Sequence, residues 1–421
     1  MLTMEDDTAV VEDVDSGWSA PRPSPHGGHT GIRVETLDRA AFLRLEHEWN
    51  ALVERTCDEP FYRHEFIRSW VDSFAPRAEM KILTGHDHAG RLVAALPLVA
   101  DRGFFYGVPV RRLVSPASLH SARFDMIAAD RRTAALAFVR TLAGDGSWDV
   151  IRLNEVPAGG TAWDLYHAAS GAGFPSGIWD SHRSPFLPLP ASWAALEARL
   201  SRKFRRNLRR GRAWLEARGA VTIERLNGAD AVRAGLEECF ALERGGWKGR
   251  QGTAAAQSRQ TLGFYTGLAQ AAASGGYFSL TFLVFAGKRI AAQYGLTRRR
   301  TYSLMMTCYD EAFAECSPGQ ILMEEVLKHA IADGLWGYEF LGVEGAWKLA
   351  WKPDLRPHHW FFIFRDSLLG RTLRNAKFAW LPAAKTLVPA ARQSLRRFQP
   401  RPRTDGEADT ETDHHLPTTW A

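Results

Sequence analysis

The residues Ser317-Pro318-Gly319-Gln320 have the types and order of a helix start that can hold an anion. Ser317 can cap the helix, Pro318 suits the first helical position, and Gln320 can complete a capping box. The N-terminus of a helix presents free N–H groups and the positive end of the helix dipole. Because Gly319 has no side chain to block an anion, the sequence predicts a phosphate-bearing ligand at Ser317, Gly319 and Gln320. A capped helix without a ligand is the alternative interpretation.

Strands on either side are expected to position this helix start. Thr301–Cys308 is apolar and strand-like, and a short loop leads from it to Ser317. Apolar residues then recur at helical spacing as far as Asp333, and Gly334 suits the end of the helix. With a further strand at Tyr338–Leu341, the segment predicts a β–loop–α–β unit.

A carboxylate and an ammonium, Glu344 and Lys348, follow that unit four residues apart. If Trp347–Trp351 begins a helix, this spacing places both groups on one face, at the C-terminal edge of the sheet. Ligands of open α/β sheets commonly gather at that edge. The alternative interpretation is a surface ion pair that contributes about 0.3–0.5 kcal/mol.

The chain carries one pattern of elements twice, which indicates duplication of a whole domain. The first copy is expected to contain helices at 42–53 and 66–74 and strands at 81–84 and 92–99. The second is expected to contain helices at 232–243 and 261–273 and strands at 278–285 and 290–296. Gly90-Arg91-Leu92-Val93-Ala94-Ala95 and Gly287-Lys288-Arg289-Ile290-Ala291-Ala292 lie at corresponding turns, 197 residues apart.

A basic helix is expected between the two copies, because apolar residues recur at helical spacing from Trp193 to Leu215. Its other faces carry Arg202, Lys203, Arg205, Arg206, Arg209, Arg210 and Arg212. We interpret Arg205, Arg206 and Arg209 as contacts to an anionic carrier or acceptor. A solvated basic face is the alternative.

The bulk properties are those of a globular protein with two domains and tails. The chain has 421 residues, 45% of them hydrophobic, and a net charge of +6. Its four cysteines form no CxxC pair, its apolar stretches are too short to span a membrane, and its acidic N-terminus is unlike a signal peptide. We therefore expect a cytoplasmic protein.

Neighbouring His358 and His359 point to opposite faces of a strand, and no metal is expected.

The expected domain boundaries follow from these patterns. They are a disordered lead-in (1–30), an N-terminal half (31–190), the basic connecting helix (191–219), a C-terminal half (220–365), a basic amphipathic segment (366–399) and a disordered tail (400–421). The segment 367–398 combines Arg and Lys with Leu, Phe and Trp. Such a segment either packs on the domain or lies on an anionic membrane surface, which would place the protein at the inner face of the membrane.

Several motifs, taken in order, resemble one family. Ser201-Arg202-Lys203-Phe204-Arg205-Arg206-Asn207-Leu208-Arg209-Arg210, Arg244-Gly245-Gly246-Trp247-Lys248-Gly249 and Glu344-Gly345-Ala346-Trp347-Lys348-Leu349-Ala350-Trp351 are the main ones, with Pro60-Phe61 and Phe66-Ile67-Arg68-Ser69-Trp70 earlier in the chain. Together with the Ser-Pro-Gly helix start, they resemble the CelD/BioF2-like acetyltransferase group of the GNAT fold, which is related to the FemAB-type peptidoglycan-bridge transferases. The resemblance covers residues 32 to 365.

The resemblance implies an α/β (α+β) fold of tandem GNAT-like halves, each a mixed, mostly antiparallel sheet flanked by helices. It implies an N-acyltransferase that moves an acetyl or other acyl group from acyl-CoA to a small-molecule or saccharide amine, in polysaccharide or cell-envelope synthesis. Glu344 is then the candidate base, Lys348 the candidate oxyanion contact and Tyr309 the candidate acid for the leaving thiolate. Trp247 and Lys248 become candidate substrate contacts.

One departure from the family pattern leaves the donor open. Ordinary GNAT enzymes carry Gln/Arg-x-x-Gly-x-Gly/Ala before the helix, whereas this chain has Ala314-Glu315-Cys316-Ser317-Pro318-Gly319. The alternatives are therefore acyl-CoA and, as in FemAB relatives, an aminoacyl-tRNA, which is the one nucleic acid considered as a partner. A non-catalytic module that binds an anionic polymer or a membrane surface is the alternative outside enzymes.

Overall fold

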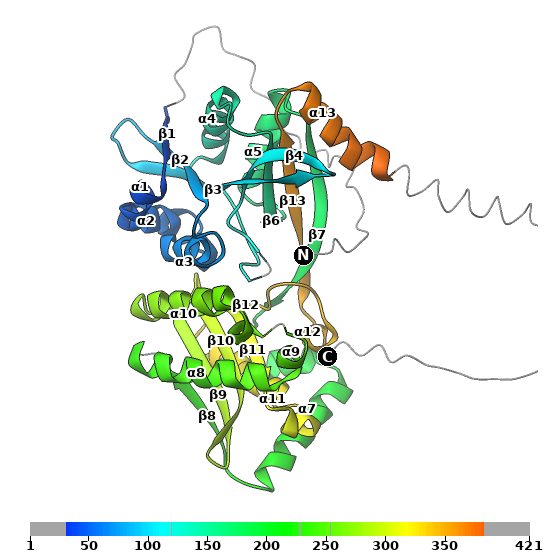
Figure 1. The fold of residues 1–421 in the computed structure, drawn as a ribbon. Coiled ribbons are helices and arrows are strands. Elements are labelled where there is room, and N and C mark those ends of the chain that lie inside the picture. The colour runs from blue at the N-terminus through cyan, green and yellow to red at the C-terminus, as the bar shows by residue number, and fades with distance from the viewer. Residues whose placement is uncertain (1–30, 119, 227–228, 253, 383–421) are drawn as a thin grey trace, which may run out of the picture.

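The computed structural model describes residues 31–118, 120–226, 229–252 and 254–382. Within these residues thirteen strands form one sheet, and helices pack against it (Figure 1). The predicted lead-in (1–30), the predicted tail (400–421) and the stretch 383–399 lie outside the described residues. No helix in the described ranges has the length and apolar character needed to cross a bilayer.

The first half begins with one strand and three helices, and its remaining strands follow with two further helices among them. Its elements are β1 (Arg33–Leu37), α1 (Arg39–Leu43), α2 (Glu46–Thr56), α3 (His64–Phe74), β2 (Glu79–His86), β3 (Leu92–Phe105), β4 (Val108–Val114), β5 (Ile127–Ala128), α4 (Arg131–Gly144), β6 (Val150–Pro157), α5 (Ala162–Gly171) and β7 (Ser176–Pro188).

The second half repeats this order after two connecting helices, α6 (Trp193–Arg199) and α7 (Arg202–Glu216). Its elements are β8 (Val221–Leu226), α8 (Ala229–Gly245), α9 (Trp247–Arg250), α10 (Arg259–Ser274), β9 (Phe278–Phe285), β10 (Lys288–Arg298), β11 (Thr301–Tyr309), the 3-10 turn η3 (Glu311–Cys316), α11 (Pro318–Ala332), β12 (Gly337–Glu339), α12 (Ala346–Leu349) and β13 (Asp354–Phe364), with α13 (Leu368–Asn375) after them.

The strand order is symmetric about the middle of the sheet. It runs β1-β2-β3-β4-β6-β13-β7-β12-β11-β10-β9-β8. From either edge, three antiparallel pairings are followed by one parallel pairing, β4 with β6 in the first half and β11 with β12 in the second. The predicted tandem arrangement is therefore confirmed, and Gly90 and Gly287 take the same left-handed turn, with φ of 76° and 80°.

The last strand of each half is exchanged with the other half. β7 follows β6 in the chain but pairs with β12, while β13 follows β12 but pairs with β6. β7 and β13 are antiparallel neighbours at the centre. The two halves consequently share one sheet instead of having the separate sheets expected from the sequence, and the boundaries at 190 and 365 stay predictions.

Helices of the two halves also pack on each other. Phe66 of α3 and Phe264 of α10 are buried and meet edge to face, with ring centroids 5.5 Å apart. Figure 1 shows α3 lying directly over α10. Both rings belong to one continuous cluster of buried side chains, in which each large side chain contributes about 1.5–3 kcal/mol. The halves are thus joined by a common core as well as by the sheet.

The predicted basic helix is two helices, not one. Leu200 is extended between α6 and α7, and the side chain of Ser201 accepts a hydrogen bond from the Phe204 N–H. Serine is a favoured N-cap, so Ser201 ends the first helix and begins the second. The apolar side of α7 packs against η3: a Cβ at Gly211 would lie 2.2 Å from the carbonyl oxygen of Cys316.

We predict that Gly211→Ala destabilises the protein by about 1–3 kcal/mol. The added methyl group would overlap the carbonyl oxygen of Cys316, and this oxygen cannot shift without moving the backbone. Gly144→Ala is the matched control, since a Cβ at the end of α4 meets nothing within 4 Å. There we expect no loss and a gain of at most about 1 kcal/mol. Urea unfolding measures both, and equal effects would contradict the close packing of α7.

Candidate acyl-transfer site

β11 and β12 separate soon after they begin. Their parallel pairing covers only Thr301–Ser303 and Gly337–Glu339, after which β12 ends and β11 continues to Tyr309. A bulge in the pairing with β10, at Tyr294 and Gly295, bends β11 at this point. The last residues of β11 therefore have no strand partner on the β12 side.

A cavity of about 320 Å³ lies beside the end of β11. It is bounded by β11, η3, the start of α11, the end of α8 with the residue after it, and one residue of α12. The lining residues are Leu242, Glu243, Gly246, Thr307, Cys308, Tyr309, Ala314, Ser317, Gly319, Gln320 and Trp347. The structure thus brings together four of the predicted site residues, Tyr309, Ser317, Gly319 and Gln320.

The start of α11 differs from the predicted capping box. Ser317 has a left-handed backbone, with φ of 55° and ψ of 58°, and its side chain makes no capping hydrogen bond. Gln320 is engaged elsewhere: its amide group donates to the Trp347 carbonyl oxygen at 3.2 Å and accepts from Trp351 Nε1 at 2.8 Å. The capping-box prediction was therefore wrong, and Gln320 ties α11 to α12.

The Gly319 N–H is left without an acceptor among the described residues. A Cβ at this position would meet only the ring of Tyr309, at the ordinary contact distance of 3.4 Å. The protein itself therefore does not require glycine here. An N–H at the first turn of a fifteen-residue helix, open to a cavity, suits an anionic group of a ligand.

Two side chains of the cavity can move protons. Tyr309 makes no hydrogen bond to another described residue through its hydroxyl, and burial raises the pKa of that phenol. Glu243 is buried, with 4% of its surface exposed, and Oε2 accepts a hydrogen bond from the Ala255 N–H at 2.8 Å. Glu243 was missed in the sequence, because nothing in its neighbourhood marks one carboxylate of α8 as the one that faces a cavity.

The two cysteines near the cavity are held by carbonyl groups. Cys308 Sγ lies 3.5 Å from the Cys239 carbonyl oxygen, and Cys316 Sγ lies 3.1 Å from that of Phe313. Burial raises the pKa of the Cys316 thiol, which keeps it protonated and a poor nucleophile. No described group of three or more His, Cys, Asp or Glu side chains is arranged to hold a metal ion.

Residues 202–352 match the family model of an acetyltransferase (GNAT) domain. This part of the chain is a GNAT acetyltransferase domain, and the protein is an acyltransferase. The fold of FemX is similar over 76% of this chain and 96% of FemX, with 11% identity and a TM-score of 0.53. A conserved protein of unknown function from Bacteroides thetaiotaomicron VPI-5482 is similar over 79% of this chain and all of that one, with 13% identity and a TM-score of 0.51. No curated protein matches the sequence.

Within the GNAT domain, Glu344 and Lys348 do not share a helix face. α12 begins at Ala346, so Glu344 precedes it, and its carboxylate pairs with Arg183 at 2.7 Å. The ammonium of Lys348 donates to the carbonyl oxygens of Leu341 and Val343, at 2.5 and 2.7 Å.

This geometry corrects the pairing predicted for the two groups. Neither side chain lines the cavity. Leu341 and Gly342 have positive φ, of 56° and 58°, so Lys348 holds a tight bend in the chain after β12.

The other residues that were predicted to contact the substrate do not line the cavity. They are the arginines of α7 and two residues of α9 whose side chains the structure does not describe. Arg206 and Arg209 are exposed on α7, and Arg209 pairs with Glu197 at 3.0 Å. Arg205 is half-buried, and its Nε has no hydrogen-bond partner within the described ranges. The backbone of α9 includes Trp247 and Lys248, but their side chains are not among those described.

The first half lacks the corresponding opening in its described residues. β4 pairs with β6 through its final residues, Arg112–Val114, and the Ser115 N–H extends the pairing by donating to the Arg152 carbonyl oxygen. Asp130 caps α4 by accepting from the Thr133 N–H. Because β4 and β6 stay paired and the start of α4 is already capped, we expect a donor to bind in the second half instead of the first.

We predict that Lys348→Met destabilises the protein by about 1–3 kcal/mol, because it leaves the carbonyl groups of the bend without their donor. Glu344→Gln is the comparison: its partner Arg183 is more than half exposed, so the ion pair contributes about 0–1 kcal/mol. Urea unfolding midpoints give both values. A larger loss in Glu344→Gln than in Lys348→Met would refute this assignment of the two residues.

Proposed function

We propose that the second half transfers an acyl group from an acyl-CoA, acetyl-CoA among them, to an amine. The observation that carries this proposal is the position of the cavity. It joins the open edge of β11 to the start of α11, where the Gly319 N–H has no acceptor in the described part of the chain. The helix start suits the pyrophosphate of the carrier, and the strand edge suits its amide and thioester groups.

When bound, acyl-CoA supplies an activated carbonyl group that an amine can attack. The chain's own residues then handle protons and charge. Glu243 accepts a proton from the amine as the new C–N bond forms, and Tyr309 gives a proton to the departing thiolate. Glu243 is buried and Tyr309 is half-buried, and the raised pKa of Tyr309 keeps the phenol protonated at neutral pH.

The acceptor is proposed as a small-molecule or saccharide amine. It would reach Glu243 from the part of the cavity lining that the end of α8 supplies. An amine held near Glu243 and a carrier held at the start of α11 would share one cavity, which supports direct transfer without a covalent enzyme intermediate.

The aminoacyl-tRNA donor is the second candidate, and the surface of α7 favours it. Arg202, Lys203, Arg206, Arg209 and Arg210 are exposed along this one helix. Such a row suits a phosphate backbone better than the few phosphates of coenzyme A.

The segment 367–398 remains our candidate for contact with an anionic membrane surface, which would be made at the inner face. In its described part Leu368 is 87% exposed and Trp380 is 56% exposed. Arg371 and Arg374 lie between them on α13. Exposed apolar side chains beside basic ones suit a lipid surface.

We predict that Gly319→Ala weakens acetyl-CoA binding about tenfold or more without loss of stability, because the added methyl group enters the cavity where the carrier approaches. Gly263→Ala, on α10, is the control: its Cβ would meet only Ser73 Oγ, at 3.5 Å. Isothermal titration calorimetry measures the affinity. Binding of acetyl-CoA to both variants with wild-type affinity would exclude this donor site, and binding of aminoacyl-tRNA alone would favour the second candidate.

We predict that Glu243→Gln and Tyr309→Phe each lower kcat by about 10²-fold, the usual scale for a positioned acid or base. Gln keeps an oxygen that accepts from the Ala255 N–H, and Phe keeps the ring against Gly319, so both variants should fold. The measurement is steady-state turnover with acetyl-CoA and a panel of amines, including amino sugars. Wild-type kcat in both variants would remove these residues from the mechanism.

A further inference from the structure

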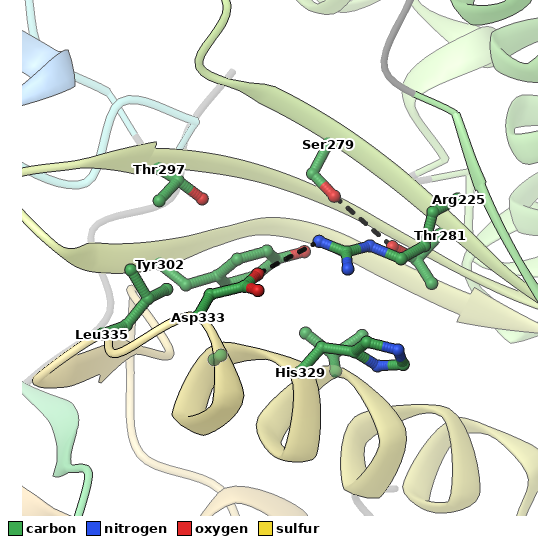
Figure 2. Close-up of a pocket in the computed structure, with 10 residues that line it drawn as sticks. Arg225, Ser279, Thr281, Thr297, Tyr302, His329, Asp333 and Leu335 are labelled. Atoms are coloured by element: carbon green, nitrogen blue, oxygen red, sulfur yellow. Dashed lines mark hydrogen bonds and ion pairs between the residues drawn. The ribbon is translucent and has the colours of Figure 1, made fainter.

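A second cavity, of about 140 Å³, lies at the other end of α11. It lies between the sheet and the last turns of that helix (Figure 2). The lining residues come from β8, β9, β10, β11, α11 and the segment after it: Arg225, Ser279, Thr281, Thr297, Tyr302, Val326, His329, Ala330, Asp333 and Leu335. α11 has fifteen residues and rises about 1.5 Å per residue. Its length therefore separates this cavity from the acyl-transfer site by roughly 20 Å.

Tyr302 carries a hydroxyl group that has no hydrogen-bond partner among the residues that the structure describes. The residue is 4% exposed, and its hydroxyl is buried without a hydrogen bond to any described group. Figure 2 shows the phenol directed toward the Arg225 side chain inside the cavity. A buried hydroxyl without a partner costs free energy, so a ligand oxygen that accepts a hydrogen bond from it would be stabilised at this site.

The ring of Tyr302 cannot easily turn away. It stacks on Tyr338 with centroids 5.0 Å apart and an interplanar angle of 12°. On another side it fills the space above Gly295, where a Cβ would lie 2.1 Å from the ring. The unpaired hydroxyl is therefore fixed at the cavity wall by the packing of the core.

The charges of the cavity balance. Arg225 and Asp333 form an ion pair at 3.5 Å. His329 donates through Nδ1 to the Glu325 carbonyl oxygen, which in the neutral ring leaves Nε2 as an acceptor. The cavity lies at the C-terminal end of α11, where the helix dipole disfavours an anion. A neutral ligand fits these groups better than a phosphate or a carboxylate.

The remaining lining is hydroxyl-rich on one side and apolar on the other. Ser279 and Thr281 on β9 lie with their hydroxyl oxygens 3.4 Å apart, and Thr297 adds a third hydroxyl from β10. Val326, Ala330 and Leu335 supply an apolar surface opposite them. A ring that carries several hydroxyl groups and C–H faces matches both surfaces.

We infer that this cavity is a binding site for a small neutral polyol, the size of a monosaccharide, separate from the acyl-transfer site. Tyr302 donates a hydrogen bond to one ligand oxygen. The paired Arg225 and Asp333 offer a donor and an acceptor to neighbouring hydroxyl groups.

The test is a saturation-transfer NMR titration with D-glucose and with glycerol, and inorganic phosphate as the anionic comparison. We expect a dissociation constant of about 1 mM for at least one of the two polyols. Tyr302→Phe should weaken that binding about tenfold, the usual effect of losing one hydrogen bond. The same variant should keep or raise the melting temperature of the ligand-free protein, since it removes an unpaired hydroxyl.

Tyr338→Phe is the matched control. Its hydroxyl is also buried but donates to Gln293 Oε1 at 3.1 Å. The substitution should therefore lower the melting temperature and leave polyol binding unchanged. Polyol binding that is equal in Tyr302→Phe and wild type would overturn the inference. So would binding of phosphate alone, or no binding of any of the three compounds.

Discussion

The antiparallel pairing of β7 with β13 is the constraint on which the rest of the structure depends. Each of these strands is the last strand of its own half in the sequence, but it pairs with a strand of the other half. Neither half can complete its sheet alone, because removing either strand would open a central edge and expose unpaired N–H and C=O groups. The exchange therefore fixes the two halves relative to each other, and with them the position of β12 beside β11.

A buried polar cluster lies at this junction. Arg123 of the first half pairs with Glu339, the last residue of β12, at 2.9 Å, and Ser184 of β7 contacts the same carboxylate at 3.3 Å. His182 and His358, from the two exchanged strands, stack with ring centroids 5.0 Å apart. Burial lowers the pKa of His358 to about 3, so the ring is neutral at physiological pH. Because the cluster holds the end of β12, it also holds the point at which β11 and β12 separate and the cavity begins.

Much of the fold could be predicted from the sequence, because periodicity and turn chemistry are local. β9 has the predicted bounds, and the matching turns at Gly90 and Gly287 identified the duplication. The exchange of β7 and β13 could not be predicted, since strand pairing between distant segments leaves no local pattern. The break at Ser201 was missed because the apolar spacing continues across it.

The site was predicted in part. Of the residues that line the cavity, Ser317, Gly319 and Gln320 were predicted from the helix start, and Tyr309 was predicted from the resemblance to GNAT enzymes. The capping box failed because Ser317 adopts a left-handed conformation and Gln320 bonds to α12. Glu344 and Lys348 were paired on spacing alone, and the actual start of α12 separates them. Glu243 faces the cavity because of the way α8 packs, and no sequence motif predicts that packing.

The most direct test of the proposed donor site is hydrogen–deuterium exchange of the full chain with and without acetyl-CoA. The open edge of β11 and the first turn of α11 carry the N–H groups that the carrier would contact. We therefore predict slower exchange at 304–309 and 317–322, and no change at the corresponding parts of the first half, 112–115 and 131–134. Protection of the first half instead, or no protection anywhere at saturating acetyl-CoA, would contradict the account.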